Sequence, residues 1–185
     1  MMLPALINLG SFNIVWFICV QGNNTLAALS TVLLLFTHCL FFVRSKTEIF
    51  VIAVFSTIGY TFDSLLATFS IIHFSAQFSG NFFGIHYTLA PTWLLCLWVA
   101  FSTTLAHSLS WLATRKVLAA LLACIFSPLS YFAGAALSDS TLQQPVYFAL
   151  ALEACFWSAL FPFGLYLSNT MHSNIRISET LLAGR

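Results

Sequence analysis

The chain has 185 residues, of which 60% are hydrophobic and only 6% are charged, and its formal net charge is +1. Soluble domains carry about a quarter charged residues, so this composition excludes an ordinary soluble domain. The near-neutral charge also gives no basis for binding nucleic acid. We therefore expect an all-α polytopic membrane protein, built as a single transmembrane helical domain over residues 1–185.

Six apolar stretches are long enough to form transmembrane helices, which need about 20 residues each. In chain order they cover residues 3–20, 25–43, 50–72, 91–112, 117–137 and 145–167. The connections are short except for the aromatic stretch His73–Ala90, which we expect to lie along the outer surface of the membrane and to be partly helical. A lid over a cavity is the alternative for this stretch. The sequence thus predicts a bundle of six transmembrane helices.

All Lys and Arg side chains fall on one side of this six-helix arrangement. They lie between helices two and three, between helices four and five, and after helix six, as Arg44, Lys46, Arg115, Lys116, Arg176 and Arg185. Cytoplasmic loops of membrane proteins are enriched in Lys and Arg. We therefore expect both termini to be cytoplasmic.

The first three predicted helices each carry polar side chains among apolar neighbours. Asn8 and Asn13 lie in the first helix, and His38 lies near the end of the second. In the third helix, Asp63 is ~15 residues from the cytoplasmic end, which places it ~22 Å along the helix and in the outer half of the membrane. Because a charge inside a membrane costs about 3 kcal/mol or more, Asp63 should face the bundle interior, and should have a partner or carry a proton.

The last three predicted helices continue this pattern. In the fourth, His107 has hydroxyl neighbours within "FSTTLAHSLSW" and falls in the inner half of the membrane. The fifth carries Ser127, Ser130 and Tyr131 near its middle, and the sixth carries Glu153 in the outer half. Each polar side chain has a structural alternative as a hydrogen-bond clip between helices. For the acids, a functional role is the default hypothesis, because intramembrane carboxyl groups are costly.

These residues predict a polar column through the bundle, with acids in the outer half and histidines in the inner half. Its candidate members are Asn13, His38, Asp63, His107, Ser127, Ser130, Tyr131 and Glu153. By helical rise, His107 lies about 10 Å or more from the two acids. Since no metal-binding motif is present either, we assign no metal ligands and expect no cofactor.

Three stretches carry a resemblance to a known family. They are "PTWLLCLWVAFSTTLAHSLSWL" (Pro91–Leu112), "SPLSYFAG" (Ser127–Gly134), and the pattern formed by Asn13, Trp16, Val20 and Gly22. Through them the chain resembles, over most of its length, a family of small bacterial multi-pass inner-membrane proteins described only as a domain of unknown function. The resemblance implies a bacterial inner-membrane location and a link to membrane lipids, and it implies no particular chemistry.

Three classes of function stay open. The first is a protein that binds or handles a lipid or small molecule through the polar column, with membrane lipids as its partners. The second is an intramembrane lipid-modifying enzyme that uses His107 with Asp63 or Glu153 as general acid or base. It requires these groups within hydrogen-bond reach of one another, which their depths disfavour. The third is a structural or assembly subunit whose partners are other membrane proteins. We favour the first class.

Overall fold

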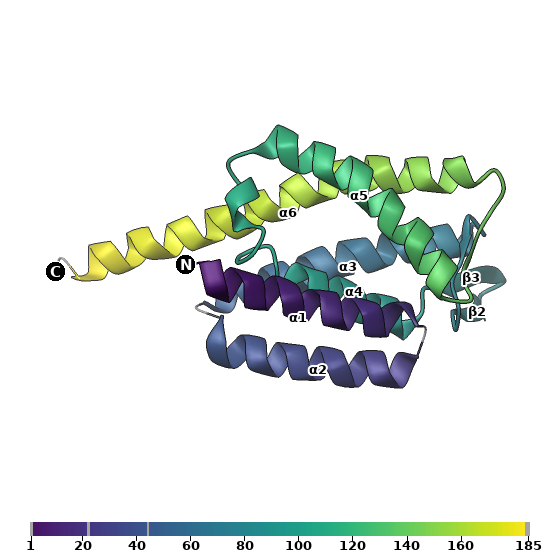
Figure 1. Ribbon diagram of the computed structural model, residues 1–185, viewed down its shortest axis with the longest axis horizontal. Coiled ribbons are helices and arrows are strands. Elements are labelled where there is room, and N and C mark those ends of the chain that lie inside the picture. Colours follow the sequence, from purple (N-terminus) through teal and green to yellow (C-terminus); the bar gives the residue numbers. More distant parts are fainter. Residues whose placement is uncertain (1, 22, 44, 184–185) are drawn as a thin grey trace.

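The computed structural model describes residues 2–21, 23–43 and 45–183, and these are mostly helical (Figure 1). The α-helices in chain order are α1 (Met2–Val20), α2 (Asn24–Phe41), α3 (Lys46–Thr68), α4 (Thr92–Ser102), α5 (Lys116–Leu137) and α6 (Val146–Ala183). Five of them, all except α4, are long and apolar enough to cross a membrane. Many of their large apolar side chains are exposed, as lipid-facing side chains would be, for example Leu33, Phe36 and Phe132. The helices are therefore compatible with a membrane protein.

The fourth predicted span is wrong as a continuous helix over residues 91–112. Helix α4 ends at Ser102, and the chain continues through turns to a short 3-10 helix, η1 (Ser110–Leu112). The hydroxyls of Ser102, Thr103 and Thr104 donate hydrogen bonds to carbonyl oxygens three or four residues earlier, at 2.7, 2.7 and 2.6 Å. Such bonds compete with the helical ladder, and three in succession favour the interruption.

The predicted partly helical loop at His73–Ala90 is also wrong, because this segment forms a β-hairpin. Strands β2 (Phe78–Phe82) and β3 (Ile85–Leu89) pair in antiparallel register. The two-residue turn between them has positive φ at both positions, 50° at Phe83 and 82° at Gly84. Two positive φ angles are typical of the turn that matches the twist of a hairpin.

A second small sheet lies at the same end of the bundle. In it β1 (Ile72–His73) pairs with β4 (Thr141–Leu142). This pairing joins the connection after α3 to the connection after α5. The expected all-α class therefore holds for the bundle and needs amendment at this end. We call it the hairpin end.

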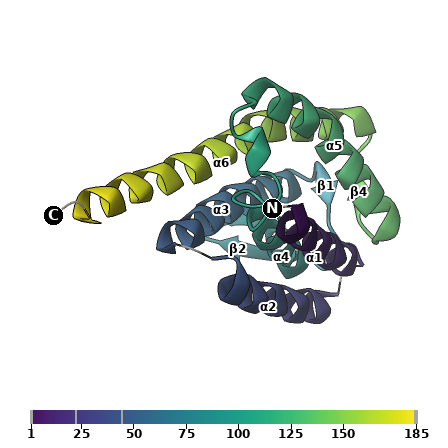
Figure 2. The same ribbon diagram turned by 60° about the vertical axis from the view of Figure 1, so that its left-hand side comes forward.

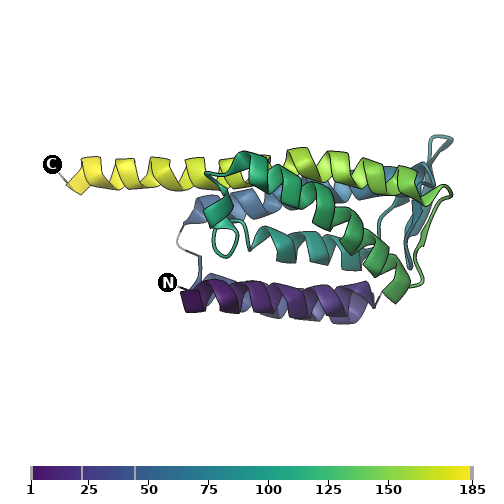
Figure 3. The ribbon, with the colours of Figure 1, turned by 45° about the horizontal axis from the view of Figure 1, so that its top comes forward.

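The opposite end carries the basic residues, and we call it the basic end. Figures 1 and 3 show that the start of α1, the end of α6 and the starts of α3 and α5 lie there, on the side away from the hairpin. Lys46 begins α3, and Arg115 and Lys116 stand at the start of α5. Arg44 and Arg185 lie outside the described residues. The six predicted segments therefore still run alternately between the two ends of the bundle. The fourth segment consists of α4 and the non-helical residues that follow it.

Short helix α4 lies at the centre of the bundle. It packs against α1, α2 and α3, while α5 and α6 form a pair beside them (Figure 2). Two glycines permit close contacts in this core. A Cβ atom at Gly59 of α3 would collide with the indole ring of Trp98, and one at Gly164 of α6 would collide with the ring of Phe55. The large side chains Trp98 and Phe55 therefore fill space that the glycines leave open.

Candidate functional site

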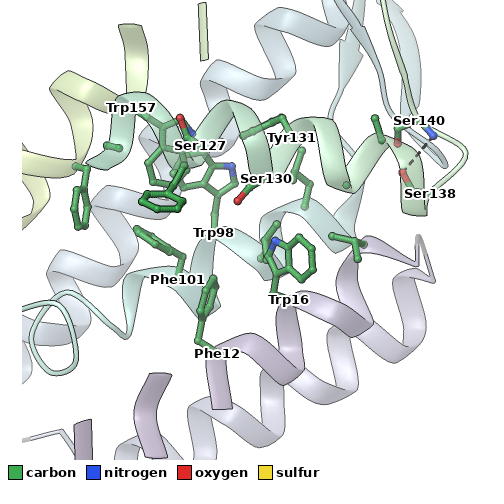
Figure 4. A pocket seen from close by; sticks show the side chains of 18 of the residues that line it. Phe12, Trp16, Trp98, Phe101, Ser127, Ser130, Tyr131, Ser138, Ser140 and Trp157 are labelled. Carbon is green, nitrogen blue, oxygen red and sulfur yellow. Dashed lines mark hydrogen bonds between the residues drawn. The ribbon is translucent and has the colours of Figure 1, made fainter. Parts of the chain in front are cut away.

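A cavity of about 480 Å³ lies between α1, α4, α5 and α6 (Figure 4). Most of its lining is aromatic or aliphatic, including Phe12 and Trp16 from α1 and Trp98 and Phe101 from α4. Toward the basic end it reaches the turns after α4, and toward the hairpin end it reaches Ser140. Its volume lies in the range of about 300–1,000 Å³ that ligand-binding pockets occupy.

From the exposed residues of its lining, we infer that the cavity opens sideways between α1 and α5. Three of its lining residues, Asn13 of α1 and Phe126 and Ser130 of α5, are exposed at the molecular surface. Asn13 and Ser130 both stand near the middle of their helices. A ligand could therefore enter halfway along the bundle, between two helices.

One wall of the cavity is polar. Ser127, Ser130 and Tyr131 reach it from α5, and Trp157 reaches it from α6 (Figure 4). The hydroxyl of Ser127 and the indole N–H of Trp157 are buried without a hydrogen-bond partner among the described residues. Because unsatisfied buried polar groups are costly, the Ser127 hydroxyl is available to a ligand in the cavity.

Asp63 lies behind this wall and is fully buried. Its carboxyl group accepts a hydrogen bond from the Trp98 indole N–H at 2.5 Å and another from the Tyr131 hydroxyl at 2.8 Å. Tyr131, a member of the predicted column, is thus one donor to Asp63, and Trp98 is a second donor that the sequence analysis did not single out. Since both side chains also line the cavity, they connect the buried acid to the cavity wall.

Glu153 is the second fully buried acid, and it has a different environment. Neither of its carboxyl oxygens makes a hydrogen bond within the described part of the chain. It interacts electrostatically with Asp63 and lies close to Trp157. The ion pairs of the described residues involve neither acid. Two carboxyl groups thus lie near each other, one with two donors and one with none.

The two histidines of the predicted column meet at the basic end. There His38 Nε2 lies 2.8 Å from Glu48 Oε1, and His107 Nε2 lies 2.6 Å from the same oxygen. His38 comes from the last turn of α2, Glu48 from the first turn of α3, and His107 from the turns after α4. Sequence reasoning missed Glu48, because it placed "RSKTE" in a connection. The Ser45-x-x-Glu48 spacing, typical of a helix start, was the available signal.

The predicted column is therefore divided into two clusters. Asp63, Tyr131 and Glu153 gather beside the cavity wall that carries Ser127 and Ser130, and the histidines gather around Glu48. Asn13 joins neither cluster, since its side chain donates to the carbonyl oxygen of Leu9 in its own helix. Its place is at the cavity opening.

Comparison with known proteins identifies one family. Residues 5–163 match the family described as "Protein of unknown function (DUF2878)". No curated protein and no solved structure matches the chain.

Proposed function

Because the chain belongs to the DUF2878 family of proteins of unknown function, we propose its role from the cavity: it is an inner-membrane protein that binds the acyl chain of a membrane lipid. The sideways opening of the cavity between α1 and α5 carries this proposal. An opening halfway along two apolar helices faces hydrocarbon when the bundle spans a membrane. Acyl chains are the molecules present there.

The membrane setting rests on the helices and on the placement of charge. Five helices are long and apolar enough to span a bilayer. Lys46, Arg115 and Lys116 lie at the basic end, which we assign to the cytoplasmic side together with both termini. The hairpin end then faces the opposite side, and its exposed aromatic residues, such as Phe82 and Phe83, are suited to the interface.

The length of the cavity suits an acyl chain. Its lining on α5 runs from Leu122 to Ser138, which corresponds to ~24 Å at a rise of 1.5 Å per residue. One leaflet contributes about 15 Å of hydrocarbon thickness, half of the bilayer core, so the lining is long enough to accommodate an acyl chain of one leaflet. The apolar walls fit the chain, and the hydroxyls of Ser138 and Ser140 at the hairpin end fit the ester or head group.

Binding is better supported than acid–base chemistry on the lipid. The enzyme alternative pairs His107 with Asp63 or Glu153. Among the described residues, His107 bonds to Glu48 instead, and Asp63 bonds to Trp98 and Tyr131. No observation specifically favours a purely structural subunit.

Filling part of the cavity with a larger side chain provides the test. A Cβ atom at Gly134 would lie 3.8 Å from Val20 Cγ1, and both residues line the cavity, so a larger side chain there occupies cavity space between α5 and α1. Gly10→Leu is the matched control, because no atom lies within 4 Å of a Cβ at Gly10. Both variants should fold, since leucine favours helices by about 1 kcal/mol over glycine in a soluble reference helix.

The assay uses the full chain in vesicles that contain a phospholipid with a photoreactive acyl chain. After irradiation, mass spectrometry compares adducts on the cavity residues Trp98, which is buried, and Phe101, which is partly buried, with adducts on the exposed Phe36. We expect cavity adducts in the wild type and in Gly10→Leu, and strong depletion of them in Gly134→Leu at unchanged labelling of Phe36. Equal cavity labelling in the two leucine variants would contradict lipid binding at this site. A change in the acyl-chain profile of cells lacking the gene would extend the result to the living membrane.

A further inference from the structure

The cluster at the basic end has the composition of a metal site. His38, Glu48 and His107 each offer one ligand atom, and these atoms all lie within 4.8 Å of one another. The three side chains come from three separate segments, so their convergence is a property of the fold. Two imidazoles and one carboxylate form the ligand set of several zinc enzymes and of mononuclear iron sites.

We propose that His38, Glu48 and His107 bind a divalent transition-metal ion of the zinc class. Imidazole nitrogen suits Zn²⁺ and its first-row neighbours, whereas Mg²⁺ and Ca²⁺ prefer sites made only of oxygen ligands. The site lies apart from the lipid cavity, since none of its three ligands lines that cavity. The proposal therefore does not depend on lipid binding.

A buried side-chain atom without a hydrogen-bond partner supports metal binding at this position. The side chains of His38 and Glu48 are only 1% and 2% exposed. Even so, Glu48 Oε2 has no hydrogen-bond partner among the described residues. A metal ion held between the side chains would give the carboxylate a second contact, because Oε2 can join Oε1 in a bidentate bond. Buried polar atoms normally have such partners.

The present spacing requires only a small expansion. Zinc–nitrogen and zinc–oxygen bonds of about 2.0–2.2 Å at tetrahedral angles hold ligand atoms about 3.3 Å apart. The two nitrogens now lie 2.8 and 2.6 Å from Glu48 Oε1. A separation of about 0.5–0.7 Å therefore opens the cluster around an ion of this size. Rotation of the partly exposed His107 side chain supplies part of that movement.

The surroundings favour an exchangeable ion with an open coordination position. The ring of Phe42 lies against both imidazoles, with centroids 5.5 Å from His38 and 5.3 Å from His107, and forms an apolar wall. The side chain of His107 is 16% exposed, which leaves one side accessible from the basic end. Three protein ligands with a free fourth position are typical of catalytic rather than structural zinc sites.

Direct metal analysis of the full chain provides the test. The protein is purified in detergent with a tag that contains no histidine, treated with a chelator, and then dialysed against Zn²⁺, Co²⁺ or Mg²⁺. We expect retention of about one Zn²⁺ or Co²⁺ per chain and no Mg²⁺. Bound Co²⁺ should show the visible absorption of a four- or five-coordinate ion, and Zn²⁺ should raise the unfolding temperature.

Variants separate this site from adventitious binding. Loss of an outer-shell partner alone weakens metal binding 10–100-fold in known sites, so His107→Ala and Glu48→Gln should weaken it by about 100-fold or more. His86→Ala, on the exposed hairpin strand β3, is the matched control and should bind as the wild type does. Should Glu48→Gln fail to fold, metal binding by His107→Ala provides the test, because the His107 side chain is partly exposed. Absence of Zn²⁺ and Co²⁺ from the wild type, or undiminished binding by His107→Ala, would overturn the proposal, while photolabelling of the cavity tests lipid binding separately.

Discussion

The two buried acids should respond in opposite ways to replacement by an apolar side chain. Asp63 accepts hydrogen bonds from the indole of Trp98 and the hydroxyl of Tyr131, whereas Glu153 accepts none. Removing the Asp63 carboxyl leaves two buried donors unsatisfied. Removing the Glu153 carboxyl leaves no donor that had been bonded to it.

These contacts set the expected magnitudes. Each buried donor left without a partner costs about 1–3 kcal/mol, so Asp63→Leu should lower the free energy of unfolding by roughly 2–6 kcal/mol. Asp63→Asn should cost less than about 1 kcal/mol, because its amide oxygen can accept from Trp98 while its amide nitrogen donates to the Tyr131 oxygen. Glu153→Met removes an unsatisfied polar group at similar volume and should raise stability by about 1–3 kcal/mol.

Unfolding of the purified variants in mixed micelles, followed by the fluorescence of the five tryptophans, measures these differences. Tyr131→Phe removes one of the two bonds to Asp63, so it should fall between the wild type and Asp63→Leu. Equal stability of Asp63→Leu and Asp63→Asn would refute the assignment of the two donors. Equal losses in Asp63→Leu and Glu153→Met would refute the contrast between the acids. If Asp63→Asn keeps its stability and loses lipid labelling, the carboxyl group acts in binding through its proton.

Two further predictions concern packing and orientation. Gly59→Ala should lower stability by about 1–3 kcal/mol in the same unfolding assay, because the new methyl group displaces the ring of Trp98, and Gly10→Ala should show no such loss. Reporter domains inserted after Arg115 should read cytoplasmic and those inserted at Gly80 external, because the basic residues gather at one end, and the reverse readings would invert the proposed orientation.

The long helices were predictable because hydropathy and length determine them directly. The expected spans 3–20, 25–43 and 117–137 agree with α1, α2 and α5 within two residues at each end. Hydropathy averages over a window, however, and does not register where a helix begins. Helix α3 begins at Lys46 rather than at residue 50, and this difference of one turn places Glu48 within the bundle.

The arrangement of the polar residues was less predictable than their depth. Position along a span follows from helical rise, but the direction in which a side chain points depends on how neighbouring helices pack. Depth alone suggested a single column, and it assigned Asn13 to the interior. Packing directs Asn13 to the cavity opening and collects the other residues at two levels. Trp98, which donates to Asp63, counts among the hydrophobic residues, so its indole N–H gave no signal as a donor.

The interruption of α4 explains how one short segment serves both levels. Glu48 and Asp63 are 15 residues apart on α3, and at about 100° per residue they point in directions only about 60° apart. Trp98 bonds to Asp63, and His107 bonds to Glu48. Trp98 and His107 are nine residues apart, so a continuous helix would direct them about 180° apart. One of them would then point away from α3. Ending the helix at Ser102 releases His107 to turn back toward Glu48, and Asn8 holds the released segment by bonding to the Thr103 carbonyl and the Ser108 hydroxyl.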